Sequence, residues 1–320
     1  MNPSTASDDD RPSLPPPSGL QLLGRIAGHA WQQTRVEGPT DGLRVLLGAG
    51  RVLGEREQLA ELFAIPAFAQ LMAAQPQADA FFFMSHRHFL SRRFDSAQRI
   101  ASALDHFRFE QAHFEPRLLP ALHGDGLRLW HHAAGVEIRL CSNKATRHEG
   151  PLGLVLRHRG ETLHEISFAW IEAARLGPAA GGGPVLFATR NQCMLPADSP
   201  TLASFRALFP QNAPPYFMFA ALTGLTGAVG QSRVVGVRDQ CQIAFEPRYA
   251  DGFRRAYDDF WLNFGGKPVG DHGLEMPVPA VVTPLAQLKA RHRARARQRR
   301  EHWRQITEAA QAALSPYLKV

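Results

Sequence analysis

Apolar and polar positions alternate in the middle of this chain, and the alternation predicts strands. It runs through 136–141 and again through 152–156, and a period of two is typical of a half-exposed strand. A turn at His158–Glu161 then leads into Thr162–Ile171, in which alternate side chains share an apolar face. These segments predict an antiparallel β-hairpin.

Upstream of residue 126 the apolar positions follow a helical spacing instead. They predict a helix over Glu55–Gln75, with a kink at Pro66 or a division into two short helices, because proline interrupts helical hydrogen bonding. Another helix follows the N-cap pair Asp95–Ser96, and a modest one is expected over Leu20–Val36. Residues 1–18 contain three Asp and five Pro with little to bury, so we expect them to be disordered.

Residues 215–266 form the segment around which the remaining elements are expected to assemble. An apolar helix starts at Tyr216 and is expected to end among three glycines. Val234–Val237 is short and rich in β-branched residues, which predicts a buried strand. A second helix carries one aromatic stripe toward a core, formed by Phe253, Tyr257, Phe260 and Phe264. Gly265–Gly266 is expected to stop it.

Four further elements complete the predicted order. A strand is expected at 184–189, and Ser199 caps a helix that runs to Phe209. Another strand at 273–278 is bounded by prolines, which places it at a sheet edge. A long final helix runs from Pro284 toward Leu314.

This order predicts an α+β fold, in which N-terminal helices precede a mixed, partly antiparallel sheet with helices on its faces. The sequence of hairpin, strand, helix, strand, helix and strand matches the GNAT acyltransferase plan, an analogy of fold that carries little weight for function. A long basic helix ends the chain. The predicted parts are a disordered tail at 1–18, a helical part at 19–125, an α+β core at 126–283 and the basic helix at 284–314.

The composition indicates a sizeable hydrophobic core, and the cysteines indicate a reducing compartment. Hydrophobic residues make up 44% of the chain, which is ample for a sizeable core. Cys141, Cys193 and Cys241 are isolated from one another, which favours a reducing compartment without disulfides and inert thiols. The chain shows neither a secretory signal nor an apolar run of transmembrane length, so we expect a cytoplasmic protein.

The net charge of +7 is concentrated in one segment. Lys289–Arg304 holds one Lys, seven Arg and a single acid, which equals the charge of the whole chain. Helical spacing sorts the arginines into two stripes, Arg293, Arg297, Arg300 and Arg304 on one and Arg291, Arg295 and Arg299 on the other. Such density favours an anion nearby: nucleic-acid phosphate, anionic lipid or lipopolysaccharide headgroups, an acidic partner, or an acidic patch of the protein itself. A merely solvated helix is the alternative.

Three carboxylates are candidates for general-base chemistry. Glu149 precedes a predicted strand and Asp239 follows one, and strand ends are where open sheets build sites. Asp258 lies beside the aromatic stripe, four residues after Arg254. Solvated loop acids and a structural ion pair are the simpler explanations.

The glycines and histidines are weaker signals. Gly224, Gly227 and Gly230 could cradle the pyrophosphate of coenzyme A, although they end a helix where a phosphate loop would open one, so helix termination and close packing is favoured. His86 and His88 could share a metal only in an extended segment. Because no partner stands at ligand spacing, no metal site is predicted.

Three motifs resemble the VirK/YbjX family, a proteobacterial family of unknown function. They are YDDFWLNFGG at Tyr257–Gly266, GLEMPV at Gly273–Val278 and the arginine-rich run from Leu285 to Trp303. The resemblance covers about Phe81 to Ile306. At Ala188–Cys193 the sequence departs from an Ile-Gly…Gln-Gly run typical of members, and the tail prefers Arg to Lys. The resemblance implies a cytoplasmic protein linked to stress, virulence or envelope resistance, with no established reaction.

Two functional hypotheses follow. The first is an acyltransferase, or a degenerate relative of one, that uses a coenzyme A thioester. The second is a non-catalytic module that binds a polyanion, nucleic acid or anionic lipid, or an acidic partner, through the arginine-rich helix. The sequence leaves the oligomeric state open.

Overall fold

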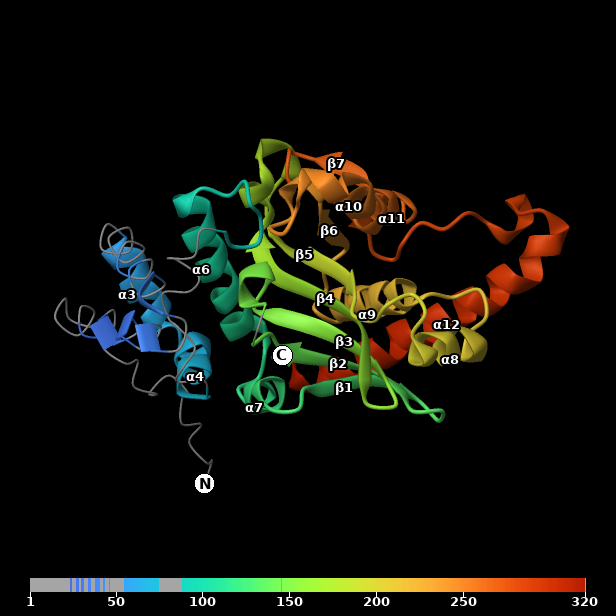
Figure 1. Ribbon diagram of the computed structural model, residues 1–320, viewed down its shortest axis with the longest axis horizontal. Helices are drawn as coiled ribbons and strands as arrows, with labels where there is room; N and C mark the ends of the chain where they lie inside the picture. The colour runs from blue at the N-terminus through green and yellow to red at the C-terminus, as the bar shows by residue number, and fades with distance from the viewer. Residues whose placement is uncertain are drawn as a thin grey trace, which may run out of the picture.

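A mixed sheet of eight strands is the centre of the computed structural model, which describes residues 55–74, 88–144 and 146–319 together with scattered positions between 24 and 46. The strands lie in the order β1-β2-β3-β4-β5-β6-β8-β7 (Figure 1). Their bounds are β1 Leu127–His132, β2 Val136–Ser142, β3 Leu152–His158, β4 Glu161–Glu172, β5 Pro184–Cys193, β6 Arg233–Val237, β7 Lys267–Val269 and β8 Gly273–Pro277.

The sheet contains one parallel step. Strands β1 to β5 form an antiparallel meander, β6 runs parallel to β5, and β8 is antiparallel to both β6 and β7. The parallel pairing is short, because it joins only Leu186–Ala188 to Val234–Gly236. Beyond Ala188, β5 stays paired with β4 while β6 ends at Val237. The carboxyl ends of the two parallel strands therefore part.

One face of the sheet is covered by the helices that precede it. These are α3 Arg56–Ala64, α4 Pro66–Ala74, α6 Ser96–His113 and α7 Leu118–His123. Helix α6 packs against β4, and it begins with a capping box in which Asp95 and Gln98 bond each other's backbone N–H groups. Pro66 begins α4 directly after α3, so the predicted kink separates two helices.

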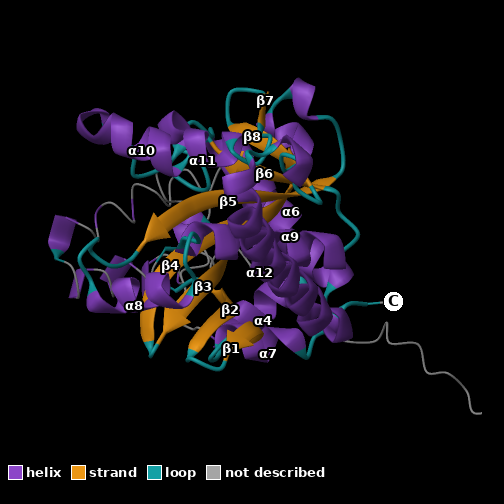
Figure 2. Ribbon diagram, turned by 90° about the vertical axis from the view of Figure 1, so that its right-hand side faces the viewer, coloured by secondary structure: helices purple, strands orange, loops and turns teal. Residues whose placement is uncertain are grey.

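The opposite face carries α8 Pro200–Leu208, α9 Pro214–Ala228 and α12 Ala290–Leu314, and Figure 2 looks onto α12 with the sheet behind it. Helix α9 packs on β3 to β6, and α12 lies against α9 and β1. Helices α10 Ala250–Ala256 and α11 Asp258–Leu262 cover the β6–β8 end. Short 3-10 turns occupy Arg147–Glu149, Ala173–Leu176, Pro178–Ala180, Asp239–Cys241, Pro247–Tyr249, Leu285–Gln287 and Ser315–Tyr317.

The predicted α+β fold is confirmed, as are the hairpin and the caps at Asp95 and Ser199. The single helix predicted across the aromatic stripe is wrong, because the backbone leaves helical geometry at the buried Tyr257. Helix α9 ends at Ala228, between Gly227 and Gly230, as predicted, and Gly224 lies inside it.

Strand and helix limits need correction as well. Strand β8 is not at the edge, because β7 pairs with its outer side. Strand β5 extends to Cys193, and α12 begins at Ala290, after a 3-10 turn that follows Pro284. The disordered tail at 1–18 and much of the helix at 20–36 lie outside the described residues. The division at 126 and 284 stays a prediction.

Candidate functional site

A buried polar cluster occupies the place where β5 and β6 part. The Glu149 carboxylate forms an ion pair with Arg190 of β5, with 2.6 Å between Oε2 and Nη1. Its other oxygen accepts a hydrogen bond from the Gln242 side-chain amide at 2.5 Å. All three residues are buried. One carboxylate oxygen of Glu149 is thus held by β5, and the other by Gln242, which follows the 3-10 turn after β6.

Neutral side chains extend this cluster toward α10 and α11. The backbone N–H of Asn191 donates to the Tyr257 hydroxyl at 3.4 Å, and the side-chain oxygen Oδ1 of Asn191 lies 2.7 Å from Nε2 of His164. Burial lowers the pKa of His164 to about 4 and raises the pKa of Tyr257 well above its ordinary value. Both groups therefore stay neutral at physiological pH.

Asp239 and Asp258 lie at the end of β6, beside the same cluster. The Asp258 carboxylate accepts a hydrogen bond from the Asp239 N–H at 2.8 Å and lies 3.4 Å from the Arg238 guanidinium. Burial raises the pKa of Asp239, and the neighbouring charge of Asp258 acts in the same direction. Gln242 joins this turn to Glu149, since its backbone N–H bonds the Asp239 carbonyl. The fold therefore brings all three predicted carboxylates to one end of the sheet.

The sequence analysis missed Arg190, Asn191 and Gln242. Polar residues that continue an apolar strand beyond 189 were the available signal for the first two. Gln242 could not be found from sequence, because its role depends on a contact with a residue 93 positions away. Neither of the two cavities described below is lined by Glu149, Asp239 or Asp258.

The three candidate glycines do not form one loop. A Cβ on Gly224 would meet the Thr307 carbonyl of α12 at 2.4 Å, so this glycine permits the close crossing of the two helices. A Cβ on Gly227 would have nothing within 4 Å, and Gly230 adopts a positive φ of 72° after α9. The phosphate-binding prediction for these residues stays a prediction.

A groove of about 490 Å³ lies between α9, α12 and the segment that follows β8. Its wall is mainly apolar and aromatic, and it includes Gly227 together with two of the predicted anion-binding arginines, Arg300 and Arg304. The remaining lining residues are Tyr216, Phe219, Ala220, Thr223, Gln231, Phe264, Val278, Pro279, Ala280, Val282, Trp303, Thr307, Glu308 and Gln311.

Comparison with protein families decides the affiliation of the chain. The model of a family described as a protein of unknown function, DUF535, matches residues 52–178 and 205–312, which is more than half of the sequence. The chain belongs to the DUF535 family. The resemblance to the VirK/YbjX proteins is thereby confirmed, because they form this family. A comparison with curated proteins finds no match.

The DUF535 match has a gap at 179–204, and this gap contains β5. It includes Ala188–Cys193, the segment that the sequence analysis expects to differ from members of the family. Glu149 and Gln242 therefore lie in the part shared with DUF535, whereas Arg190 and Asn191 lie outside it. The groove, by contrast, is built entirely from residues within the match.

The arginines of this DUF535 chain differ in their surroundings. Arg304 pairs with Glu301 at 2.6 Å and with Glu308 at 2.7 Å, which raises the pKa of Arg304 and lowers that of Glu301. Arg299 lies 5.3 Å from the Trp303 ring centre. Two others, Arg293 and Arg300, donate to backbone carbonyls, while Arg291, Arg293, Arg295 and Arg297 all have exposed side chains.

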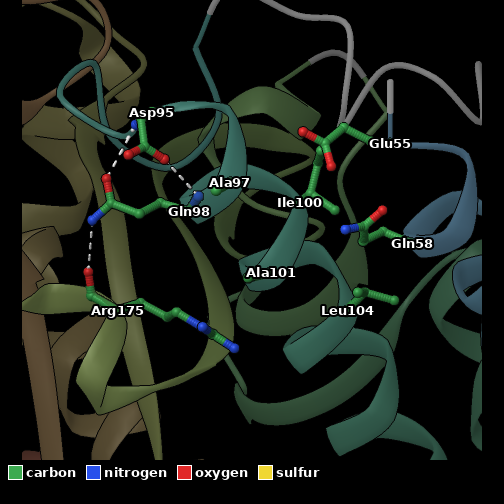
Figure 3. Close-up of a pocket in the computed structure, with 9 residues that line it drawn as sticks. All are labelled: Glu55, Gln58, Asp95, Ala97, Gln98, Ile100, Ala101, Leu104 and Arg175. Carbon is green, nitrogen blue, oxygen red and sulfur yellow. Dashed lines mark hydrogen bonds between the residues drawn. The ribbon is translucent and has the colours of Figure 1, made fainter. Parts of the chain in front are cut away.

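A second cavity, of about 310 Å³, lies between α3 and α6 (Figure 3). Three of its polar residues, Asp95, Gln98 and Arg175, already have partners. Gln98 accepts from the Asp95 N–H and donates to the Arg175 carbonyl, and the Arg175 guanidinium pairs with Asp105 at 2.9 Å. Its walls leave little unpaired polarity for a ligand.

Metal and thiol chemistry receive no support from these contacts. Within the described ranges no three His, Cys, Asp or Glu side chains are placed to hold a metal, and His86 lies outside those ranges. The Cys241 thiol donates to the Asp271 carbonyl at 3.2 Å, and burial raises its pKa. In the same part of the chain no helix is both long and apolar enough to cross a bilayer.

Proposed function

We propose that this protein binds anionic membrane surfaces through one projecting element, residues 281–299, which we call the arginine arm. The arm contains one Lys and five Arg and no acid. Its helical end extends beyond the rest of the molecule at the right of Figure 1. The main observation in support is that the basic residues lie close in sequence to exposed apolar side chains: Val281 is 64% exposed and Val282 is 38% exposed.

Apolar and basic groups on one surface favour a bilayer over nucleic acid. A bilayer offers phosphate groups to arginine and a hydrocarbon layer to valine, whereas duplex DNA offers mainly phosphate at its surface. The segment with the valines is held at the helix, because Arg300 donates to the Thr283 carbonyl. Arg295 and Arg297 are exposed and have no acid near them within the arm.

The test is co-sedimentation with vesicles of phosphatidylcholine alone or mixed with phosphatidylglycerol. Each basic residue near an anionic surface contributes about 1 kcal/mol, so replacing Arg291, Arg295 and Arg297 with Gln is expected to weaken binding roughly 100-fold. The double variant Val281→Ser, Val282→Ser is expected to weaken vesicle binding at every salt concentration, because it removes apolar contacts that salt does not screen.

The matched control removes the same charge elsewhere, by Gln in place of the exposed residues Arg206, Arg248 and Arg255. Equal losses in the arm variant and this control would mean that only net charge matters, and the proposal would fail. The nucleic-acid alternative would be established instead if the protein does not bind vesicles but binds duplex DNA, and if replacing the two valines leaves DNA binding unchanged.

Acyl transfer from a coenzyme A thioester is the second candidate, and the strand order supports it. The order has one parallel step, as in the GNAT plan, and Glu149, Asp239 and Asp258 stand where the parallel strands part. In open sheets ligands bind at the carboxyl ends of strands. Asp239 is the candidate general base, because burial raises its pKa above the ordinary value and so makes the carboxylate more basic.

Thermal unfolding with acetyl-CoA or a long-chain acyl-CoA tests this candidate. A ligand at about 100 times its Kd stabilises the folded state by about 2.7 kcal/mol, which raises the melting temperature measurably. Asp239→Asn should keep that shift and lose acyl transfer. If no acyl donor changes the melting temperature, acyl transfer is excluded.

A further inference from the structure

We propose that the groove between α9 and α12 holds one acyl chain of an anionic phospholipid. Its volume of about 490 Å³ lies within the range of roughly 300–1,000 Å³ that is usual for ligand pockets. Phe219, Phe264 and Trp303 give it aromatic surface, and Val278 and Ala280 add aliphatic surface. Such a surface fits hydrocarbon.

The hollow has a cause in the sequence of α9. Gly224 brings α9 and α12 into contact, because no side chain separates it from the Thr307 carbonyl and Ala310. One turn further on, Gly227 again lacks a side chain, but open space lies where its Cβ would be. Glycine therefore allows close helix packing at Gly224 and leaves open space beside the helix at Gly227.

The charge at the groove favours an anionic head group. Arg304 and Glu308 both line the groove and neutralise each other, with Glu301 as a second partner of Arg304. Among the residues that the structure describes, Arg300 donates to the neutral Thr283 carbonyl and pairs with no carboxylate. A half-buried guanidinium without a carboxylate partner, at the edge of an apolar groove, suits the phosphate of a lipid.

The groove is continuous with the arginine arm. Val282 belongs to both, and Val281 next to it is exposed. The choice of a phospholipid as the occupant rests on the proposed membrane binding, because a protein held at an anionic surface meets lipid chains there. The aromatic and apolar wall stands independently of that proposal.

Gly227→Leu is the decisive variant. The leucine would fill open space without meeting another side chain within 4 Å of its Cβ, so the protein should fold. Titration calorimetry with monomeric dioctanoyl phosphatidylglycerol measures the affinity. The lipid should bind the parent protein, and its affinity for Gly227→Leu should be lower by roughly tenfold or more. Gly227→Ala is the matched control and should bind almost as the parent does. Arg300→Gln should lower the affinity for phosphatidylglycerol more than the affinity for phosphatidylcholine of equal chain length.

The outcomes separate the groove from the arm. Gly227→Leu should sediment with anionic vesicles as the parent does, and the arginine-arm variant should still bind the monomeric lipid. Vesicle binding without monomer binding would overturn the groove proposal and leave membrane binding intact. Unchanged lipid affinity in Gly227→Leu would also overturn it. Tighter binding of octanoyl-CoA than of phosphatidylglycerol would show a thioester as occupant and contradict the choice of phospholipid.

Discussion

At the scale of single residues, the two glycines inside α9 show how one residue type acts in opposite ways. Gly224 is required by a neighbour, because the position of its missing Cβ lies 2.4 Å from the Thr307 carbonyl and 2.9 Å from the Ala310 side chain. Gly227 is required by nothing in the fold, since its surroundings are open. The unoccupied space at Gly227 is therefore free to serve a ligand.

Alanine at these two positions is predicted to change stability in opposite directions. Gly224→Ala forces α12 away and should lower the free energy of unfolding by about 1–3 kcal/mol, as overpacking does. Gly227→Ala should raise it by up to about 1 kcal/mol, because alanine favours the helix. Urea denaturation measures both. Stabilisation by Gly224→Ala would contradict the crossing geometry.

His164 is predicted to make the protein sensitive to acid. Its pKa of about 4 in the folded chain lies below the ordinary value of about 6.5, so between these values only the unfolded chain takes up the proton. Stability should therefore fall as pH drops from about 6.5 to 4, by an amount on the order of 3 kcal/mol. His164→Gln should flatten this part of the curve in equilibrium unfolding.

The exposed His131 supplies the control, and His131→Gln should leave the acid dependence of the parent in place. Burial also lowers the pKa of His123, of His272 and of His302, so some acid dependence should remain in the His164 variant. An unchanged curve in His164→Gln would contradict the prediction that His164 contributes to the acid sensitivity.

At the scale of elements, α12 consists of two halves with different surroundings. Its first ten residues are largely exposed and basic, whereas Ile306, Ala310 and Leu314 in the second half are buried against the body. The polar and apolar residues thus separate along the helix as well as around it. The second half anchors the first.

Substitutions in the two halves are predicted to affect different properties. Ile306→Ala should lower the free energy of unfolding by about 2–4 kcal/mol, as large-to-small changes in a core do. Arg297→Gln should leave it within about 0.5 kcal/mol, because the side chain is exposed. Thermal and urea unfolding measure both changes. A large loss in Arg297→Gln would show that the arm is part of the packed structure.

At the scale of the whole molecule, the residues after α12 connect the two helical layers past the β1 side of the sheet. Leu318 forms a β-bridge with Phe114 at the end of α6. The Glu115 N–H donates to the Tyr317 carbonyl, and the Lys319 N–H donates to the His113 carbonyl. The helix that carries the arm is therefore tied to the opposite face.

Deletion of residues 315–320 is predicted to destabilise the fold as a unit. The deletion removes these backbone hydrogen bonds, each worth about 1 kcal/mol net, together with the packing of Tyr317 and Leu318. We expect a single unfolding transition at lower urea concentration, and faster hydrogen exchange at the end of α6. Leu318→Ala, which keeps the backbone bonds, should lose less. Full stability after deletion would show that the link is unimportant.

The pattern of apolar positions was enough to predict most elements. Period two identifies β2, β3 and β4, and the local signals at Pro66, Asp95 and Ser199 place helix boundaries within a residue. These features depend on near neighbours in the chain, which is why they can be predicted. Strand β7 was missed because three residues carry no period.

Contacts between distant residues decided the rest. Tyr257, where the helix breaks, contacts Asn191, which lies 66 positions away, and the pairing of Glu149 with Arg190 joins residues 41 positions apart. Likewise, the sequence alone predicted that seven arginines share a helix, but only the packing of α12 against α9 shows that Arg300 and Arg304 line an apolar groove. Local preference sets the conformation of a segment, whereas the location of a site depends on which segments the hydrophobic core brings together. The hydrophobic effect is non-directional, so an apolar segment can pack against residues that are near or far in the sequence.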